Sequence, residues 1–313
     1  MSEKDIIDLL KADLEHLDPQ KVDFASAKIN NILYTSKQKE AVNTIIKKIL
    51  NQASDKLRAA MSRSIAENPY LDKVLAKGFA LDIEEISAPF LSITPVLTDE
   101  DLIEILDDLS EEGLVAVASR PTVGSFLSSC LINKGCNKAA KRLIDNNGAK
   151  LSTTCLEDAM RLYSNDEEFL RTVLSRSDIV ASITIKAIKH MAYLSSEEIW
   201  KKSPLDAEPS RKIARDAEYA VITEILENSD QKKQIQLLEV YKKSNDLSSL
   251  YLLYLSNNNK RTLLKMALLT ILGVNPKNIP KYVKDEPAVR FHQIVSKLEI
   301  QSHIKDNIIS SII

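Results

Sequence analysis

The 313-residue chain has little glycine, few aromatic residues and few cysteines, and each shortage narrows the choice of fold. Only 6 residues are glycine and 5% are aromatic. Sheets with tight turns depend on glycine, and sandwiches and barrels favour aromatic side chains. Leu, Ile, Ala, Lys and Glu dominate instead, and this composition favours helices joined by short polar turns.

The chain also lacks long apolar runs and a strong excess of one charge. No apolar run approaches the roughly 20 residues that a membrane-spanning helix needs. The opening "MSEKDIIDLLKADLEHL" carries acids within its apolar spacing, unlike a signal peptide. The formal net charge of -2 predicts no strong attraction to nucleic acid or to an anionic membrane. We therefore expect a cytoplasmic protein without a membrane span. Non-classical export into a host stays an alternative, because such signals often cannot be read from sequence.

No catalytic or metal-binding pattern is legible. The odd number of cysteines forms no even disulfide framework, and their spacing lacks the close pairs of zinc sites. The "GCNK" stretch at 135–138 lacks the glycine pair and the Lys-Ser/Thr ending of a phosphate loop. We therefore expect no catalytic residue, cofactor or metal, and predict that the chain is not an enzyme. The cysteines and the widely separated histidines are Cys130, Cys136, Cys155, His16, His190, His292 and His303.

What the chain does have is a recurrence. Five stretches place an apolar residue before a small or polar pair and a break: "IAENPYL", "LSITPVL", "ASRPTV", "IDNNGAKL" and "LSRSDIV". Successive stretches stand 26 to 30 residues apart, a length that fits a pair of helices with two short turns. Proline or glycine breaks four of them, at Pro69, Pro95, Pro121 and Gly148. The leading apolar residues, predicted to be buried, are Ile65, Leu91, Ala118, Ile144 and Leu174.

One helix pair cannot bury its own apolar face, whereas stacked pairs share a continuous core. We therefore predict an all-α fold, a right-handed α-solenoid of HEAT-like two-helix repeats. Residues 1–52 are expected to form an N-terminal helical cap, 53–203 the repeat array and 204–313 a helical C-terminal region; the alternative is that this region continues the array. The proline-containing, charge-rich "KKSPLDAEPSRK" at 201–212 is predicted to be a long turn or linker.

Local signals predict where single helices begin and end. Thr98, with Asp101 three residues later, predicts a capping box before "DEDLIEILDDL". The same spacing of Ser195 and Glu198 predicts a helix start before "EEIWKK". Gly135 is expected to end the helix that precedes it.

Several stretches in order resemble the helical "domain of unknown function 2336" family, found mainly in alphaproteobacteria. They are "APFLSITPVLTDEDLIEIL", "LVAVASRPTVGSFLSSCLINKG", "LIDNNGAKLSTTCLEDAM", "LRTVLSRSDI" and the C-terminal "DLSSLYLLYLSNNNKRTLLKMALLTILGVN". The resemblance covers the chain from about Ala53 onward. It implies a bacterial helical-repeat protein and brings no activity, ligand or catalytic residue. The richness in Lys, Asn and Ile departs from the family's common pattern and indicates an AT-rich genome, as in host-associated bacteria.

A dense row of acids from 99 to 112 contains no Lys or Arg. A calcium loop would need alternating oxygen ligands around a central glycine, whereas leucines and isoleucines interrupt these acids at helical spacing. Two interpretations remain: a solvated helix face with its caps, or an acidic strip for a basic partner that includes Asp107 and Asp108.

The leading hypothesis for function is a non-enzymatic scaffold or adaptor that binds another protein along a curved helical surface. Aromatic anchors carry much of the affinity in such interfaces, so the candidate contacts are Tyr163, Trp200, Tyr251 and Tyr254. A nucleic-acid-binding or repair-type repeat protein and an exported bacterial effector are the alternatives. Two local basic clusters support the former, at Lys134, Lys138, Lys141 and Arg142, and at Lys201, Lys202, Arg211, Lys212 and Arg215.

Overall fold

A computed structural model describes residues 53–176, 178–202, 207–285, 288–298 and 300–312, with a few positions before residue 52. Every regular element in this part is a helix, so the predicted all-α class is confirmed there. None of the helices in the described ranges has an apolar stretch long enough to cross a membrane. The predicted N-terminal cap at 1–52 lies almost wholly outside the described residues.

The chain forms two compact units, Met1–Leu162 and Tyr163–Ile313, called unit 1 and unit 2 below. This division differs from the predicted boundary at 203/204, which falls inside unit 2. The helices of unit 1 are α4 (Asp55–Ile65), α5 (Lys73–Ala80), α6 (Glu84–Ile93), α7 (Asp99–Ile105), the short 3-10 helix η2 (Leu106–Asp108), α8 (Glu111–Ala118), α9 (Ser125–Asn133), α10 (Asn137–Asp145) and α11 (Thr153–Tyr163).

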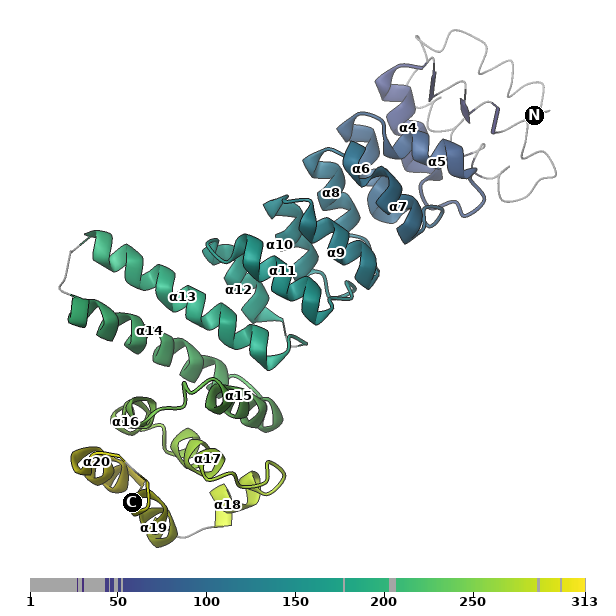
Figure 1. Ribbon diagram of the computed structural model, residues 1–313. Coiled ribbons are helices and arrows are strands. Elements are labelled where there is room, and N and C mark those ends of the chain that lie inside the picture. Colours follow the sequence, from purple (N-terminus) through teal and green to yellow (C-terminus); the bar gives the residue numbers. More distant parts are fainter. Residues whose placement is uncertain are drawn as a thin grey trace. The chain divides into compact units, whose positions relative to one another are not determined.

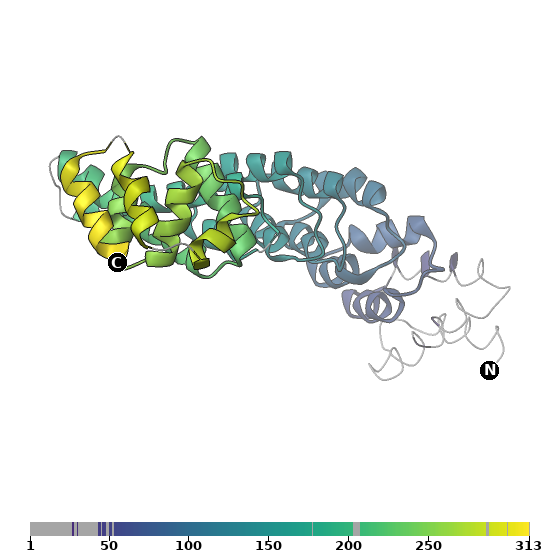
Figure 2. The same cartoon turned by 90° about the horizontal axis from the view of Figure 1, so that it is seen from below.

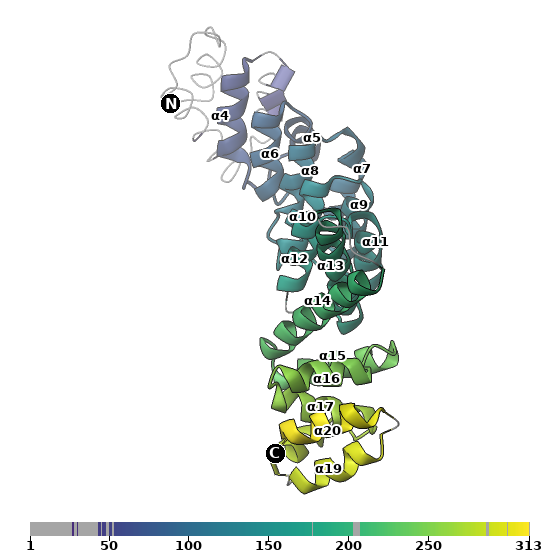
Figure 3. The same cartoon turned by 90° about the vertical axis from the view of Figure 1, so that its left-hand side faces the viewer.

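Unit 1 is built in two layers of alternating helices. The first helices of successive pairs, α4, α6, α8 and α10, each pack on the next, and the second helices α7 and α9 pack on each other (Figures 1 and 3). The leading residues of the first four recurring stretches, Ile65, Leu91, Ala118 and Ile144, are completely buried. The recurrence in the sequence therefore marks successive helix pairs that share one core.

Local capping explains where these helices begin. Thr98 and Asp101 form the predicted capping box: the Thr98 hydroxyl accepts from the Asp101 amide, and the Asp101 carboxylate accepts from the Thr98 amide. The Asp72 and Ser110 side chains cap α5 and α8 by accepting hydrogen bonds from first-turn amides, without the reciprocal bond. Gly135, with φ +76°, follows the end of α9 as predicted.

We call the turn between the two helices of a pair a corner; the third and fourth corners are each hydrogen-bonded to the corner before them. Arg120 donates to the carbonyl oxygens of Leu91 (2.7 Å), Thr94 (2.8 Å) and Leu97 (3.2 Å) in the preceding corner. Exactly 26 residues later, the Asn146 amide donates to the carbonyls of Ala118 (2.9 Å) and Arg120 (2.7 Å). A residue at one repeat position thus satisfies carbonyls that the preceding helix end leaves unpaired.

The fourth corner also approaches the third very closely. A Cβ atom on Gly148 would lie 1.9 Å from the Pro121 carbonyl oxygen, so only glycine fits there. Next to it, Val123 and Ala149 form an isolated parallel bridge, through bonds from the Val123 amide to Gly148 O (3.3 Å) and from the Lys150 amide to Val123 O (2.9 Å). These contacts fix the register of one helix pair on the next.

Unit 2 has its own extended apolar core, which runs from α13 to α20. Its helices are α12 (Glu167–Ser175), α13 (Ala181–Lys202), α14 (Ala207–Glu227), α15 (Gln231–Lys243), α16 (Ser249–Asn257), α17 (Arg261–Ile271), α18 (Ile279–Asp285), α19 (Ala288–Ser296) and α20 (Ser302–Ile312). The two longest, α13 and α14, pack along each other as a hairpin (Figure 1), and α19 packs on α20 in the yellow part of the ribbon in Figure 2.

Three local predictions in unit 2 need correction. Ser195 does not start a helix: it lies inside α13, where its hydroxyl donates to the Met191 carbonyl at 3.0 Å. The predicted linker at 201–212 is mostly helical, because α13 runs to Lys202 and α14 begins at Ala207; residues 203–206 lie outside the described part. In the fifth recurring stretch Val173 is fully buried and Leu174 only half-buried, so the predicted register is off by one residue.

Candidate functional site

The acidic row of unit 1 is paired with lysines from the helices on both sides of it. From α5, Lys73 Nζ lies 2.7 Å from Asp101 Oδ2, and Lys77 Nζ lies 2.6 Å from Glu104 Oε2. The Lys73 ammonium, helped by bonds from Thr98, lowers the pKa of the Asp101 carboxyl from 3.8 to about 2. This end of the row therefore joins neighbouring helix pairs.

The other end of the row is paired in the same way. Lys134, just after α9, is ion-paired with Asp107, and Lys138 of α10 lies 3.2 Å from Glu112 Oε1 and 3.6 Å from Glu111 Oε2. Hydrogen bonding to Glu112 raises the pKa of the Lys138 ammonium. These ion pairs neutralise charge in both the acidic row and the first basic cluster. Both groups therefore offer a partner less charge than the sequence suggests.

The two aspartates predicted to contact a partner are both on the surface. The Asp107 side chain is 87% exposed despite its pairing with Lys134. Asp108, the last residue of η2, is exposed beside it. Both aspartates are accessible to solvent. Only a short part of the acidic row is exposed without a lysine nearby.

The aromatic candidates lie mostly in packing positions. Tyr163 and Tyr251 are buried, which leaves their rings no surface for a partner and argues against the predicted contact. Tyr163 packs its ring 5.3 Å from that of Phe169. Tyr254 is half-buried, and the side chain of Trp200 lies outside the described residues.

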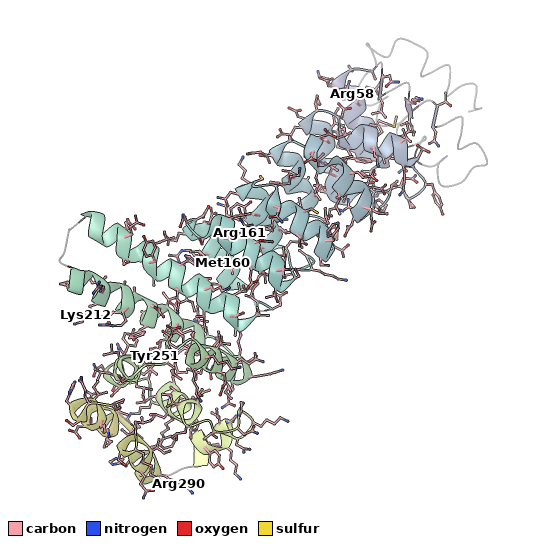
Figure 4. All side chains as sticks on the ribbon, viewed as in Figure 1. Arg58, Met160, Arg161, Lys212, Tyr251 and Arg290 are labelled. Carbon is pink, nitrogen blue, oxygen red and sulfur yellow. The ribbon has the colours of Figure 1, made fainter. Side chains whose placement is uncertain are left out.

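Tyr251 belongs to a tyrosine cluster inside unit 2, where Figure 4 labels it. Its ring centroid lies 5.0 Å from Tyr219 and 5.3 Å from Tyr241. The Tyr241 hydroxyl donates to Glu218 Oε1 at 2.7 Å, and the Tyr251 hydroxyl shares a bond of 3.2 Å with Thr223. Burial raises the pKa of both hydroxyls. They therefore act as neutral hydrogen-bonding groups within the core.

The cysteines and histidines are not gathered at one place. Cys136 and Cys155 are buried and Cys130 is half-buried, all as free thiols. Burial raises the pKa of the Cys155 thiol, which makes it a poor nucleophile. His190 and His303 are exposed. Within the described ranges, no group of three or more His, Cys, Asp or Glu side chains is arranged to hold a metal ion.

Sequence reasoning missed four exposed apolar residues of unit 1 that lie in its corners or at the helix ends beside them. We call this set the corner face and define it as Tyr70, Val74, Ile93 and Phe126. Val74 is 75% exposed, Phe126 72% and Tyr70 48%. Val74 and Phe126 are the second residues of α5 and α9, two helix pairs apart. Val74 and Phe126 are separated by two 26-residue periods, but Glu100 occupies the equivalent position of the pair between them, so the sequence shows no continuous apolar row.

A second feature, also missed, is a pocket of about 560 Å³ in unit 2 between α17, α18 and α19. Leu269 and Phe291, both buried, contribute to its apolar lining, and the half-buried Ile294 adds to it. Arg290, at the start of α19 (Figure 4), and Lys297, just after its end, are exposed members of the lining. The pocket therefore combines an apolar interior with positive charge at its rim.

The family model for an uncharacterised protein conserved in bacteria, DUF2336, matches residues 86–312. The match begins later than the resemblance suggested, at Ile86 rather than near Ala53. The searches among curated proteins and among solved structures gave no match.

Proposed function

Since the chain belongs to the DUF2336 family of bacterial proteins, and that family brings no activity with it, we propose from the geometry that it is a non-enzymatic scaffold that binds another protein. The corner face of unit 1 is the proposed binding surface. The observation that carries this is the exposure of Val74 and Phe126 at equivalent positions of the repeat.

The proposal treats the helix pairs of unit 1 as a HEAT-like α-solenoid, right-handed as in the original prediction. Support comes from the repeated packing of α4 on α6, α6 on α8 and α8 on α10. Arrays of this kind leave one edge of every pair exposed, so equivalent positions of successive pairs form an extended surface. A partner that binds along the edge would meet the same position at each repeat.

Large apolar side chains are costly to leave in water, and exposed apolar patches mark interaction surfaces. Aromatic residues are also enriched among the contacts that dominate binding energy. Phe126 and Tyr70 are the aromatic members of the corner face. Because the acidic row is largely paired within the chain, we expect affinity to come from these apolar contacts more than from charge.

The nucleic-acid alternative needs a continuous positive stripe that displaces counterions from phosphates. In unit 1 the first basic cluster gives little support for it. Lys134 and Lys138 are ion-paired with carboxylates, and Arg142 donates to the Ser119 hydroxyl at 2.8 Å. A protein partner is therefore the function that unit 1 supports best.

The test is quantitative affinity purification of the full chain from a lysate of the bacterium of origin. The double variant Val74→Glu/Phe126→Glu should lose at least about 10-fold of each protein that wild type retains, since buried anchors of an interface contribute about 2 kcal/mol or more. Tyr193→Glu is the matched control: Tyr193 is also an exposed aromatic residue, but it lies on α13 of unit 2.

All three proteins should have the same melting temperature, because the substituted residues are exposed. Equal retention of every partner by the double variant and by wild type would refute the corner face as the binding surface. Equal loss in the Tyr193→Glu control would show that added negative charge alone explains the result.

A further inference from the structure

The pocket of unit 2 owes its shape to the way α17 ends. Gly273, with φ +72°, lets the chain reverse after the helix. Its amide donates to Thr270 O at 3.0 Å, and the Val274 amide donates to Leu269 O at 3.1 Å. This is the Schellman arrangement, which brings the residue after the glycine against the last turn of the helix. Val274 and Leu269 both line the pocket, so its apolar wall follows from a helix end that the sequence specifies.

The opposite wall comes from one face of α19. Arg290, Ile294 and Lys297 are four and three residues apart, so helical spacing aligns them. Phe291 is completely buried beneath them, with Lys265 Nζ 5.3 Å from its ring centroid. This face therefore offers an apolar residue flanked by two cations along the pocket.

The charge of the lining has one sign. Arg290 and Lys297 are its charged members, and none of the described residues that line the pocket is acidic. The polar remainder is made of amide side chains and the Tyr282 hydroxyl, which can donate hydrogen bonds. An apolar interior with cationic and donor groups at the rim is complementary to a molecule with an apolar body and an anionic head.

We propose that this pocket binds a small amphiphilic anion, in which an apolar body rests on the accessible lining residues Leu272, Val274 and Ile294 and a carboxylate or similar head is held by Arg290 and Lys297. The volume of about 560 Å³ is in the range of small-molecule sites, roughly 300–1,000 Å³. Charge-assisted hydrogen bonds to the head orient the ligand, and burial of its apolar body provides the affinity. The site is in unit 2 and does not depend on the interaction proposed for unit 1.

The probe is decanoate, titrated into the full-length chain by isothermal titration calorimetry below its micelle concentration. We expect one bound decanoate per chain. Decyltrimethylammonium, with the same tail and opposite charge, should bind at least about 10-fold more weakly, because the two rim cations would repel it. Inorganic phosphate, an anion without a tail, should give no measurable heat.

Two variants test the contacts to the anionic head and to the apolar tail of decanoate separately. Arg290→Gln/Lys297→Gln should weaken decanoate binding at least about 10-fold, as expected for the loss of hydrogen bonds to a charged group. Leu272→Asn tests the apolar side: Leu272 lines the pocket but is 43% exposed, so its replacement should lower affinity without unfolding the chain. Lys277→Gln is the control, since Lys277 is an exposed cation on the nearby loop that does not line this pocket.

Circular dichroism and melting temperature establish that each variant is folded. The proposal is overturned if wild type does not bind decanoate, or if binding is the same in the double variant, or if the Lys277→Gln control loses as much as the double variant. It is also overturned if a single-stranded oligonucleotide displaces decanoate and binds more tightly, because the rim would then serve a phosphate backbone.

Discussion

At the scale of single residues, the most informative side chain is Arg120. Its guanidinium satisfies three carbonyl oxygens of the preceding corner, at Leu91, Thr94 and Leu97. Desolvation lowers its pKa, yet arginine stays charged at any pH of interest. Only its planar, forked donor group has the reach and the number of N–H groups to bond all three carbonyls. Arg120 therefore has a structural role in joining consecutive helix pairs.

Arg120→Lys should therefore lower the free energy of unfolding by about 2 kcal/mol, since it leaves carbonyls without a donor. Urea unfolding followed by circular dichroism measures the change. Arg142→Lys is the matched control: the Arg142 side chain is 48% exposed, and its replacement should be silent within about 0.5 kcal/mol. Equal effects of the two changes would contradict the role given to Arg120.

The lowered pKa of Asp101 predicts that the stability of unit 1 depends on pH. Its pKa is lowered from 3.8 to about 2 in the folded chain by Lys73 and by its bonds to Thr98. A depressed pKa means that the carboxylate stabilises the fold above about pH 4, and that this contribution is lost as pH falls from about 4 toward 2. We expect wild type and Asp101→Asn to differ most at neutral pH and to converge near pH 2, as measured by urea unfolding at a series of pH values. A constant difference across that range would contradict the assignment.

At the scale of helices, the spacing of the corners determines which residue of each helix is buried in the core. The first four leading residues are fully buried, whereas Leu174 of the fifth stretch is half-buried and its neighbour Val173 takes the core position. The spacing explains this. The fifth stretch follows the fourth by 30 residues instead of 26 or 27, so its helix meets the core with a different face.

Leu91→Asp should abolish cooperative unfolding of unit 1, because an unpaired charge in the core costs at least several kcal/mol. Leu174→Asp should cost clearly less, since a half-buried side chain leaves the carboxylate access to water. Thermal unfolding by circular dichroism compares the two. If Leu174→Asp were the more damaging change, the burial of the fifth stretch would be misassigned.

At the scale of the whole molecule, each compact unit has its own buried apolar set. Domains with separate cores generally unfold as separate cooperative units. Leu264 is completely buried in the core of unit 2. We therefore expect Leu264→Asp to remove hydrogen-exchange protection from α14 to α20 while α6, α8 and α10 stay protected. Loss of protection throughout the chain would show that the two units fold as one.

The sequence predicted the features that depend on neighbouring residues and missed those that depend on distant ones. The capping box at Thr98 and the corner at Pro95 are local, so spacing sufficed. The partner of Asp101 is Lys73, 28 residues away, and no local pattern specifies it. Tyr251 was a candidate contact by residue type alone, and the apolar run "SLYLLYL" shows no polar face that would have placed it in the core.

The long α13–α14 hairpin was missed for a related reason. The two prolines near residue 204 indicated a linker, but Pro209 lies in the first turn of α14, where its missing N–H costs nothing. The corner face and the pocket of unit 2 went unnoticed because exposure and concavity arise only when helices from different parts of the chain are assembled. Composition alone cannot distinguish a solvent-facing leucine from one in the core.

The hydrogen bonds between consecutive corners limit which insertions and deletions such a chain can accept. Arg120 and Asn146 each reach the corner exactly one period upstream, and Gly148 fits against Pro121 only in that register. Losing or gaining one residue within a helix pair would misalign all of these contacts at once, whereas gaining or losing a complete 26-residue module would restore them. Relatives of this protein should therefore have grown and shrunk by whole modules, with single-residue differences confined to the stretches between them.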